Sequence, residues 1–297
     1  MDIQNLAQQF YEYSLYMRGY SKATVKRYKY VIEFYIKHFQ IQKIDEVTES
    51  NVRELFFYGR TQRKWSTATF IVFYKSLSVF FKWCITKGCL EKNPIGDIEK
   101  PRLEKRLPAK LTKQDAFRLL EVIYNYPYNN KLLRVRNHAI FSVFLFAGLR
   151  LKELLHLRYS DVDLENLTLF INQGKGNKDR MVPISNTLVI TLKRYLEERK
   201  YRNKTCPEFF TSLNLNSGFT VSGLKNLVVK IRQAAGINFT IHKLRHTFAT
   251  LMLEGGCDIY SLSKMMGHSD IKTTTIYLAA SAEHLRLQIT KHPMNGL

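Results

Sequence analysis

Apolar residues recur at helical spacing through the first hundred positions of the chain. One such stripe advances in steps of three and four residues, which places its members on a single face of a helix. Its members are Val25, Tyr28, Ile32, Tyr35 and Phe39. The same periodicity predicts a second helix that begins near Thr48 and a third, rich in phenylalanine, over 66–87. Stripes of this kind are typical of helix cores, so the pattern indicates a helical domain.

The helical pattern breaks at Asn93-Pro94, a pair that favours a turn. The segment EKPRLEKRLPAK that follows, residues 99–110, contains two prolines and five Lys or Arg residues. This composition cannot form a core and is typical of an interdomain linker. We therefore expect a helical domain over 1–98, a linker over 99–110 and a second domain over 111–297.

The second domain is predicted to be mainly helical with a small β element. Thr112 and Asp115 have the spacing of a capping box that opens a helix. Residues 167–172 and 181–184 flank the sequence GKGNK, whose glycines and asparagine are typical of a hairpin turn. Helical periodicity resumes near Asn186. The expected fold class is mainly α with a small β-hairpin or sheet, in two domains.

The formal net charge of +21 implies a polyanionic binding partner. Residues 1–110 carry 20 Lys and Arg against 11 Asp and Glu, and residues 111–297 carry 26 against 14. Because both parts are basic, both are expected to contact the polyanion, which favours nucleic acid. Candidate DNA contacts are Lys22 and Lys26 in the predicted helix, Arg102, Lys105 and Arg106 in the linker, and Lys178 in the hairpin turn. A solvated surface residue is the simpler interpretation for each lysine of the helix, whereas for the linker a DNA contact and a solvated segment are equal alternatives.

Several classes of protein are excluded by the same composition. The four cysteines form no C-x-x-C pair and no zinc-type cluster, so we expect free thiols in a reducing cytoplasm. The N-terminus lacks the pattern of a signal peptide, and no apolar run approaches the length of a membrane span. The apolar run at 141–149 is expected to be a buried core helix. Neither a Walker A motif nor a paired-carboxylate metal site is present, so we expect no metal and no cofactor.

Three segments of the second domain carry candidate chemistry. In AGLRLKELLHL, Arg150 lies at an expected helix start, where free backbone N–H groups favour a phosphate, and Glu153 follows on the same face. In IHKLRHTFAT, the side chains of His242, Arg245 and His246 lie within one helical turn of each other. The third segment, MMGHSDIKTTTIYLAAS, contains His268 and, nine residues later, Tyr277.

Taken in order, these segments resemble the tyrosine recombinase (phage integrase) family, most closely its small Xer-type members. The resemblance rests on GLRLKELLHL, GKGNKDRMVPI, HKLRHTFAT and MGHSDIKTTTIY, and it extends to GYSKATVKRY and NPIGDIEKPR in the first domain. It thus covers nearly the whole chain. The family's catalytic pattern corresponds here to Arg150, Lys175, His242, Arg245, His268 and Tyr277.

The resemblance implies cleavage of a DNA strand by Tyr277, which would form a 3′-phosphotyrosyl bond and free a 5′ hydroxyl. Arg150 and Arg245 would neutralise the charge that builds on the phosphate in the transition state. Lys175 would protonate the leaving 5′ oxygen, with Lys178 as the less favoured substitute. A partner strand's 5′ hydroxyl then reverses the step, so the exchange passes through a Holliday junction and needs no nucleotide cofactor.

Two further catalytic residues are His242 and His268, and two supporting residues are Glu153 and His246. His242 is the expected base for the phenol of Tyr277, and His268 is expected to bind a phosphate oxygen. Glu153 would orient the guanidinium group of Arg150 without contacting the DNA. His246 is interpreted as a supporting or core residue in preference to a catalytic one, and it is expected to pack against the helix that carries Tyr277.

The resemblance also implies a SAM-like helical DNA-binding domain and a DNA breaking-rejoining catalytic domain that close around double-stranded DNA as a clamp. Strand exchange would need a tetramer on two sites, in DNA integration, excision or resolution, with or without a partner recombinase or accessory protein. The segment containing Leu285, Leu287 and Ile289 would dock either on a neighbouring protomer or on its own domain. The alternatives are a type IB topoisomerase and a DNA-binding protein that has lost catalysis.

Overall fold

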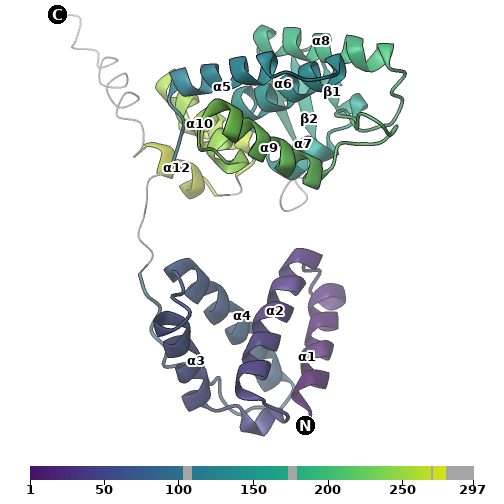
Figure 1. The fold of residues 1–297 in the computed structure, drawn as a ribbon. Helices are drawn as coiled ribbons and strands as arrows, with labels where there is room; N and C mark the ends of the chain where they lie inside the picture. The colour runs from purple at the N-terminus through teal and green to yellow at the C-terminus, as the bar shows by residue number, and fades with distance from the viewer. Residues whose placement is uncertain (103–108, 173–178, 269, 279–297) are drawn as a thin grey trace, which may run out of the picture. The chain divides into compact units, whose positions relative to one another are not determined.

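The computed structural model describes residues 1–102, 109–172, 179–268 and 270–278 (Figure 1). The chain divides into two compact units, Met1–Lys105 and Arg106–Leu297. This division falls inside the segment expected to be a linker, of which residues 103–108 lie outside the described residues. The predicted fold class, mainly α with a small sheet, is confirmed.

The first unit is built from helices alone in its described part. Side-chain oxygens of Asp2, Ser21, Thr48 and Ser66 cap the starts of its four α-helices. The helices expected near Thr48 and over 66–87 are both present. The elements are α1 (Ile3–Glu12), a π-helical turn η1 (Tyr13–Met17), α2 (Lys22–Phe39), a 3₁₀ turn η2 (Ile44–Glu46), α3 (Glu49–Thr61) and α4 (Thr67–Thr86).

Helix α4 is the central element of this unit, because α1, α2 and α3 all pack against it. It is long and apolar enough to cross a membrane by length and composition alone, which corrects our expectation that no apolar run approaches that length. Its phenylalanines instead fill the core: Phe80 is fully buried and contacts the ring of Phe10 edge-on. Core packing therefore accounts for the apolar composition of this helix.

We expect Phe80→Ala to lower the free energy of unfolding of the first unit by about 3–5 kcal/mol, because it leaves a cavity in the core. Trp65 and Trp83, the only two tryptophans in the sequence, both lie in this unit. Tryptophan fluorescence of the full chain in urea therefore follows this unit selectively. The matched control is Phe57→Ala on α3, whose ring is 69% exposed and whose loss should change stability by less than about 0.5 kcal/mol. Equal shifts for the two variants would contradict this account of the core.

The second unit combines helices with one small sheet. Thr112 accepts a hydrogen bond from the backbone of Asp115, as expected for the first half of the predicted capping box. The helices are α5 (Lys113–Asn125), α6 (Lys131–Phe146), α7 (Leu151–His156), α8 (Asn186–Tyr201), α9 (Val221–Ala235), α10 (Ile241–Glu254), α11 (Ile259–Met266) and α12 (Lys272–Leu278), with a 3₁₀ turn η3 at Tyr159–Asp161.

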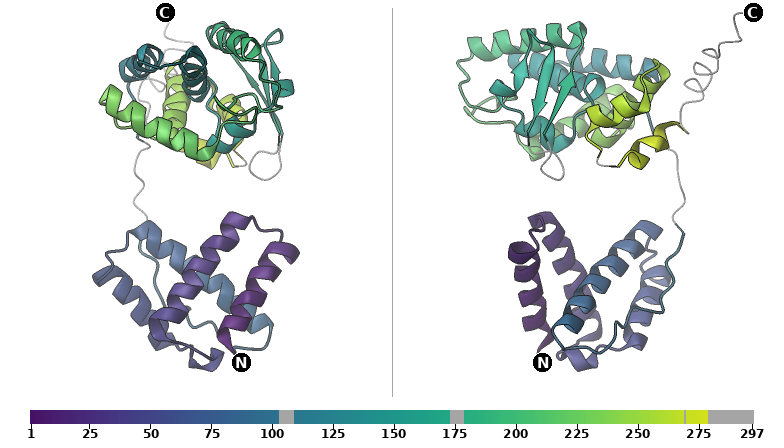
Figure 2. Two further views of the ribbon diagram at one scale, coloured as in Figure 1. Left: turned by 45° about the vertical axis from the view of Figure 1, so that its right-hand side comes forward. Right: turned by 180° about the vertical axis from the view of Figure 1, so that it is seen from behind.

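The sheet has three antiparallel strands in the order β1 (Val162–Asp163), β2 (Thr168–Ile171) and β3 (Arg180–Pro183). The predicted hairpin is confirmed as β2 and β3, with Leu169 opposite Val182, while the two-residue strand β1 was not predicted. Leu169 and Val182 are buried, and the alternate residues Phe170 and Met181 are exposed. Seen from behind in Figure 2, this sheet lies in front of the helices, with α11 and α12 beside it.

Helix α6 forms the centre of the second unit and packs against α5, α8 and α10. The apolar run expected to be a buried core helix, 141–149, begins in its C-terminal half, where residues 139–145 are all buried. The helix ends at Phe146, so the last three residues of the run belong to the turn before α7 and not to a helix. A smaller hydrophobic cluster joins α10 to α11 and α12. It includes Phe248, Met266 and Tyr277. These contacts bring the candidate segments together, although they are distant in sequence.

Candidate active site

The start of α7 is fixed by a turn at Gly148. This residue has φ of +61°, and a Cβ added to it would lie 2.2 Å from Cδ1 of Phe248, so only glycine fits. The turn places Arg150 at the N-cap of α7, where its backbone N–H donates to Oε2 of Glu153 at 2.7 Å. A helix start of this kind favours negative charge, and Glu153 supplies one.

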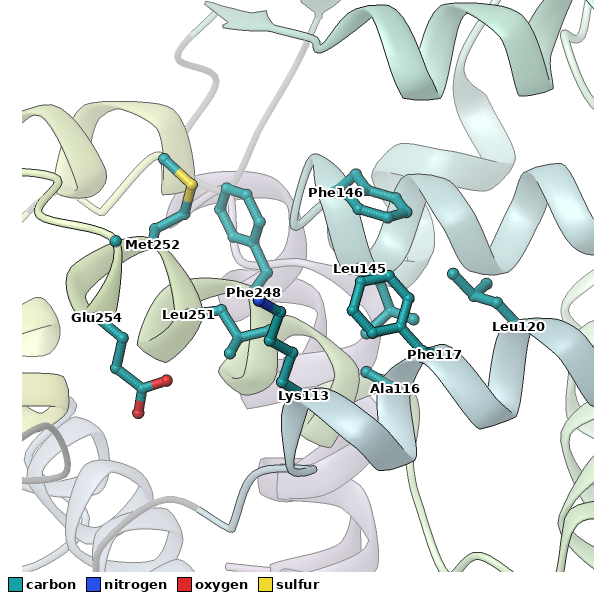
Figure 3. A pocket seen from close by; sticks show the side chains of 11 residues that line it. Lys113, Ala116, Phe117, Leu120, Leu145, Phe146, Phe248, Leu251, Met252 and Glu254 are labelled. Carbon is teal, nitrogen blue, oxygen red and sulfur yellow. The ribbon is translucent and has the colours of Figure 1, made fainter. Parts of the chain in front are cut away.

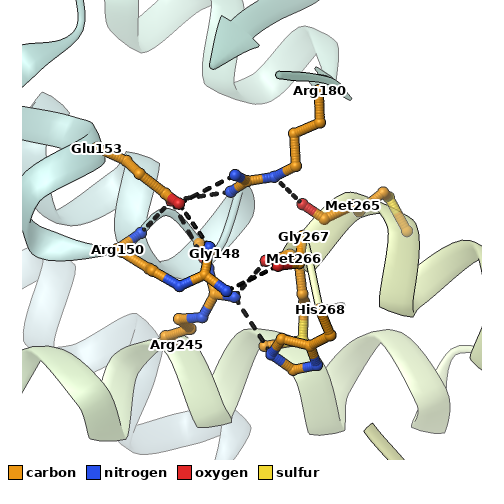
Figure 4. Close-up of polar contacts among 9 residues, drawn as sticks. All are labelled: Gly148, Arg150, Glu153, Arg180, Arg245, Met265, Met266, Gly267 and His268. Carbon is orange, nitrogen blue, oxygen red and sulfur yellow. Dashed lines mark hydrogen bonds and ion pairs between the residues drawn. The ribbon is translucent and has the colours of Figure 1, made fainter. Parts of the chain in front are cut away.

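The carboxylate of Glu153 lies among three guanidinium groups (Figure 4). Nη1 of Arg150 donates to Oε1 at 2.6 Å. Arg180 donates to both oxygens, with Nη1 at 3.0 Å from Oε1 and Nη2 at 2.8 Å from Oε2. Nη1 of Arg245 lies 3.9 Å from Oε2. The cluster therefore holds three positive charges against one negative charge and is suited to binding an anion.

The end of α11 fixes the same three arginines from the other side. Nε of Arg180 donates to the carbonyl of Met265 at 2.8 Å, Arg245 donates to the carbonyl of Met266, and Nη2 of Arg150 donates to the carbonyl of Gly267 at 2.9 Å. The last carbonyls of a helix have no partner within the helix and carry partial negative charge, which explains why they attract cations. Three consecutive carbonyls thus hold one guanidinium each.

Two pKa values report the crowding of charge in this cluster. Burial alone would raise the pKa of Glu153, but hydrogen bonds and charge from Arg180, then from Arg150, bring it to about 2. Burial, followed by repulsion from Arg150, lowers the pKa of Arg245 to about 10. Both groups are therefore charged near pH 7.

His268 joins this cluster at the turn after α11. Its Nε2 lies 3.4 Å from Nη2 of Arg245, and its Nδ1 lies 2.8 Å from the hydroxyl of Thr274, which is fully buried on α12. Burial and then the charges of Arg245 and Arg150 lower the pKa of His268 to about 4, so the ring is neutral at pH 7. Because a guanidinium group only donates, Nε2 of His268 accepts from Arg245, and Nδ1 carries the ring hydrogen and donates it to the hydroxyl of Thr274.

Tyr277 lies on α12 with only 2% of its surface exposed. Its hydroxyl is 2.8 Å from Nδ1 of His246 on α10. Burial raises the pKa of Tyr277, and the positive charges of Arg245 and Arg150 act in the opposite direction. The phenol therefore lies within the electrostatic influence of both arginines, although its hydrogen-bond partner is a histidine.

The structure brings together Arg150, Glu153, Arg245 and His268, and it places His246 against Tyr277. His242 lies one turn before His246 on α10 and is exposed. Lys175, Lys178, Lys105 and Arg106 lie outside the described residues. Of the candidate DNA contacts that are described, Lys22, Lys26 and Arg102 are all exposed.

Sequence reasoning missed Arg180 and Thr274. Arg180 is the first residue of β3 and pairs with Ile171 across the hairpin, and its side chain is only 9% exposed. The one signal available in the sequence was an arginine next to the predicted hairpin turn. Its burial is seen only in the structure, where an arginine is rarely buried without a partner. Its position joins the hairpin to both Glu153 and α11.

An apolar pocket of about 390 Å³ lies between α5, α6 and α10 (Figure 3). Phe117, Phe146, Phe248 and Met252 line it. The charged residues of the arginine cluster do not line this pocket, so it is a separate feature. In the described residues, no group of three or more His, Cys, Asp or Glu side chains is arranged to hold a metal ion.

Comparison with models of known protein families identifies the family to which the chain belongs. Residues 110–284 match the model of the phage integrase family, and residues 6–88 match that of the phage integrase N-terminal SAM-like domain. The chain belongs to the phage integrase family. The two matches lie in both compact units and include every residue of the arginine cluster, as well as Tyr277.

Curated relatives match this chain along most of their length. Tyrosine recombinase XerA of Pyrococcus horikoshii is 32% identical over 281 residues, which cover 93% of this chain and 90% of the relative. Tyrosine recombinase XerD of Listeria monocytogenes is 30% identical over 289 residues, covering 92% and 93%. Among solved structures, XerH site-specific recombinase in a pre-cleavage complex with difH substrate is 25% identical, with a TM-score of 0.69, covering 90% of this chain and 79% of that chain.

We expect Glu153→Gln to lower the free energy of unfolding of the second unit by about 3–5 kcal/mol, because it leaves three guanidinium groups without their shared counter-charge. Far-UV circular dichroism in urea measures the effect, and tryptophan fluorescence should not shift because both tryptophans lie in the first unit. Glu165→Gln, on the exposed loop between β1 and β2, is the matched control and should be nearly neutral. A loss no larger than that of the control would contradict the proposed role of this carboxylate.

The lowered pKa of Glu153 also predicts how the free energy of unfolding of wild type and of Glu153→Gln depends on pH. A carboxylate whose pKa is lower in the folded state stabilises the fold above its unfolded pKa of about 4.3 and loses that effect as the pH falls. The stability difference between wild type and Glu153→Gln should therefore narrow as the pH falls from about 4.3 towards 2. A constant difference over this range would show that the carboxylate charge is not what stabilises the cluster.

Proposed function

We propose that this protein is a site-specific tyrosine recombinase that cleaves DNA through Tyr277 and rejoins the strands with a new partner. The observation that carries the proposal is a buried phenol under the electrostatic influence of Arg150 and Arg245, which are gathered around one carboxylate. The curated relatives named above, at up to 32% identity over nearly the full chain, are tyrosine recombinases. Their similarity supports the same reaction here.

The arginine cluster is suited to the scissile phosphate. A phosphodiester repels nucleophiles because it is negatively charged, and charge grows on its nonbridging oxygens as the nucleophile attacks. Arg150 and Arg245 are proposed to bind those oxygens, since a guanidinium group matches phosphate in geometry and charge. His268 is proposed to bind a further oxygen. Because backbone carbonyls already hold the arginines, little reorganisation is needed during the reaction.

The chemistry is proposed as two transesterifications. Tyr277 attacks the phosphorus and forms a 3′-phosphotyrosyl bond, while Lys175 protonates the departing 5′ oxygen; Lys178 is the less favoured donor. His242 is the base expected from the family pattern. The 5′ hydroxyl of a partner strand then attacks the phosphotyrosine. The phosphodiester energy is kept in the covalent intermediate, so the reaction needs no nucleotide cofactor.

Both basic units are proposed to contact the DNA duplex as a clamp. Lys22 and Lys26 lie on the exposed first turns of α2, and Arg102 is exposed at the end of the first described segment. The structure of XerH in complex with its difH substrate supports a DNA site as the partner. A helix N-terminus with exposed lysines is a common arrangement at a phosphate backbone.

A tetramer on two DNA sites is the proposed active assembly, because strand exchange joins four cut ends. The segment with Leu285, Leu287 and Ile289 lies outside the described residues, and its docking in cis or in trans remains a prediction. A partner recombinase or accessory protein is compatible with the same chemistry. The four cysteines are free thiols, which fits action in a reducing cytoplasm.

We expect the full chain to form a covalent complex with a nicked duplex that carries its recombination site, because the nick lets the cleaved fragment diffuse away before rejoining. Tyr277→Phe should abolish the complex, since it removes the attacking oxygen. Tyr260→Phe on α11, whose ring is 61% exposed, is the matched control and should react as wild type does. Complex formation by Tyr277→Phe would overturn the assignment, and DNA relaxation without recombination would favour a topoisomerase.

DNA binding should weaken steeply with salt. If both units contact phosphates, the slope of log affinity against log salt concentration should be several units, with about 0.9 for each phosphate contact. The double variant Lys22→Gln, Lys26→Gln should reduce the slope by about 2, as measured by fluorescence anisotropy. Lys43→Gln, beyond the opposite end of α2, is the control and should leave the slope unchanged. A flat dependence for wild type would contradict the clamp.

A further inference from the structure

The phenol of Tyr277 has a specific partner that its proposed role as nucleophile does not explain. Its hydroxyl lies 2.8 Å from Nδ1 of His246, with the two ring centroids 5.5 Å apart. The packing of α12 against α10 brings the two residues together from 31 positions apart in sequence. His242, the base expected from the family pattern, is one helical turn away and exposed.

The protonation states of the pair define the direction of this hydrogen bond. Burial raises the pKa of Tyr277, so the phenol keeps its proton near pH 7. Burial, and then the neighbouring His242 and Arg245 on the same helix, lower the pKa of His246, so its ring is neutral. The phenol therefore donates to the lone pair of Nδ1, and the ring hydrogen lies on Nε2.

The charged and titratable groups around His246 come from three segments. His242 and Arg245 face it from α10, Tyr277 from α12 and His268 from the turn after α11, and the charge of His246 in turn affects His268. A proton that arrives on Nδ1 would thus enter a region already rich in positive charge. That region would gain the negative charge of the DNA phosphate when substrate binds.

We propose that His246, rather than His242, takes the phenolic proton when Tyr277 attacks DNA; this rests on the proposed recombinase function. In the step, the bond between the phenolic oxygen and phosphorus forms and the bond from phosphorus to the 5′ oxygen breaks. The phenolic proton moves to Nδ1 of His246, and the leaving oxygen takes a separate proton from the general acid. Rejoining reverses each transfer and returns the proton from His246 to the phenol.

Two variants separate proton transfer from a purely structural hydrogen bond. In His246→Asn, the amide oxygen occupies roughly the place of Nδ1 and still accepts a hydrogen bond, but it cannot take a proton near neutral pH. His246→Ala removes both properties. A structural role predicts that His246→Asn keeps wild-type activity while His246→Ala loses it. Proton transfer predicts that both variants are slow.

The measurement is the single-turnover rate of covalent complex formation by the full chain on a nicked duplex. We expect His246→Asn to slow cleavage by about 10²- to 10⁴-fold, the usual contribution of a general base. The matched control is His156→Asn, at an exposed position on α7, which should react at the wild-type rate. Circular dichroism and noncovalent binding of the same duplex should be unchanged in all these variants.

A second substrate identifies which proton is affected. With sulfur in place of the leaving 5′ oxygen, the departing thiolate needs no proton, so loss of the general acid is rescued but loss of the base is not. His246→Asn should remain slow on this substrate, whereas Lys175→Ala should recover.

The pH dependence of the cleavage rate gives a further test. The wild-type rate should fall as acid protonates His246. This decline should be absent in His246→Asn and unchanged in His156→Asn.

The outcomes separate this inference from the proposed function. A wild-type rate for His246→Asn with normal covalent complex formation would overturn the role of His246 alone. So would rescue of His246→Asn by the sulfur substrate, or a large loss confined to His242→Asn. Absence of any covalent complex with wild-type protein on either substrate would overturn both proposals.

Discussion

The site depends on one buried carboxylate. Arginines repel each other, and gathering three of them in a poorly solvated place is unfavourable unless a negative charge lies between them. Glu153 supplies that charge and contacts Arg150 and Arg180 directly, with Arg245 just beyond hydrogen-bonding distance. Since a single carboxylate offsets only part of the charge, a positive surplus is left for an anion. The same interaction therefore stabilises the fold and prepares the site.

Helix α11 completes this arrangement from the opposite side. Its last carbonyls hold the guanidinium groups, so the arginines are oriented by two sets of contacts that come from different parts of the chain. Formation of the cluster requires the start of α7, strand β3, helix α10 and the turn after α11 to be in place together. The anion site is thus a product of the packed unit and not of any single motif, which is why each motif alone is a weak signal.

Local features were the most predictable part of the fold. The capped helix starts at Thr48 and Thr112 and the hairpin of β2 and β3 follow from short-range spacing, and the structure contains all of them. The two-residue strand β1 has no periodicity to detect. Packing of His246 against the helix of Tyr277 was expected, but the hydrogen bond between the two side chains was not, because it depends on how α10 and α12 pack across 31 positions. The phenylalanine stripe of α4 correctly predicted a core helix, although its length and apolarity alone would suit either a core or a membrane.

The lowered pKa values of Arg245 and His268 have a shared physical origin, which links proton binding to anion binding. Burial and the neighbouring arginines disfavour positive charge on both groups. A phosphodiester entering the cluster adds a negative charge where positive charge is in excess, and so relieves the repulsion that lowers both values. By linkage, an anion that makes protonation easier must itself bind more tightly to the protonated site. The repulsion between positive charges in the free protein therefore favours the binding of an anionic substrate. The bound phosphate in turn favours protonation of His268, which is neutral in its absence.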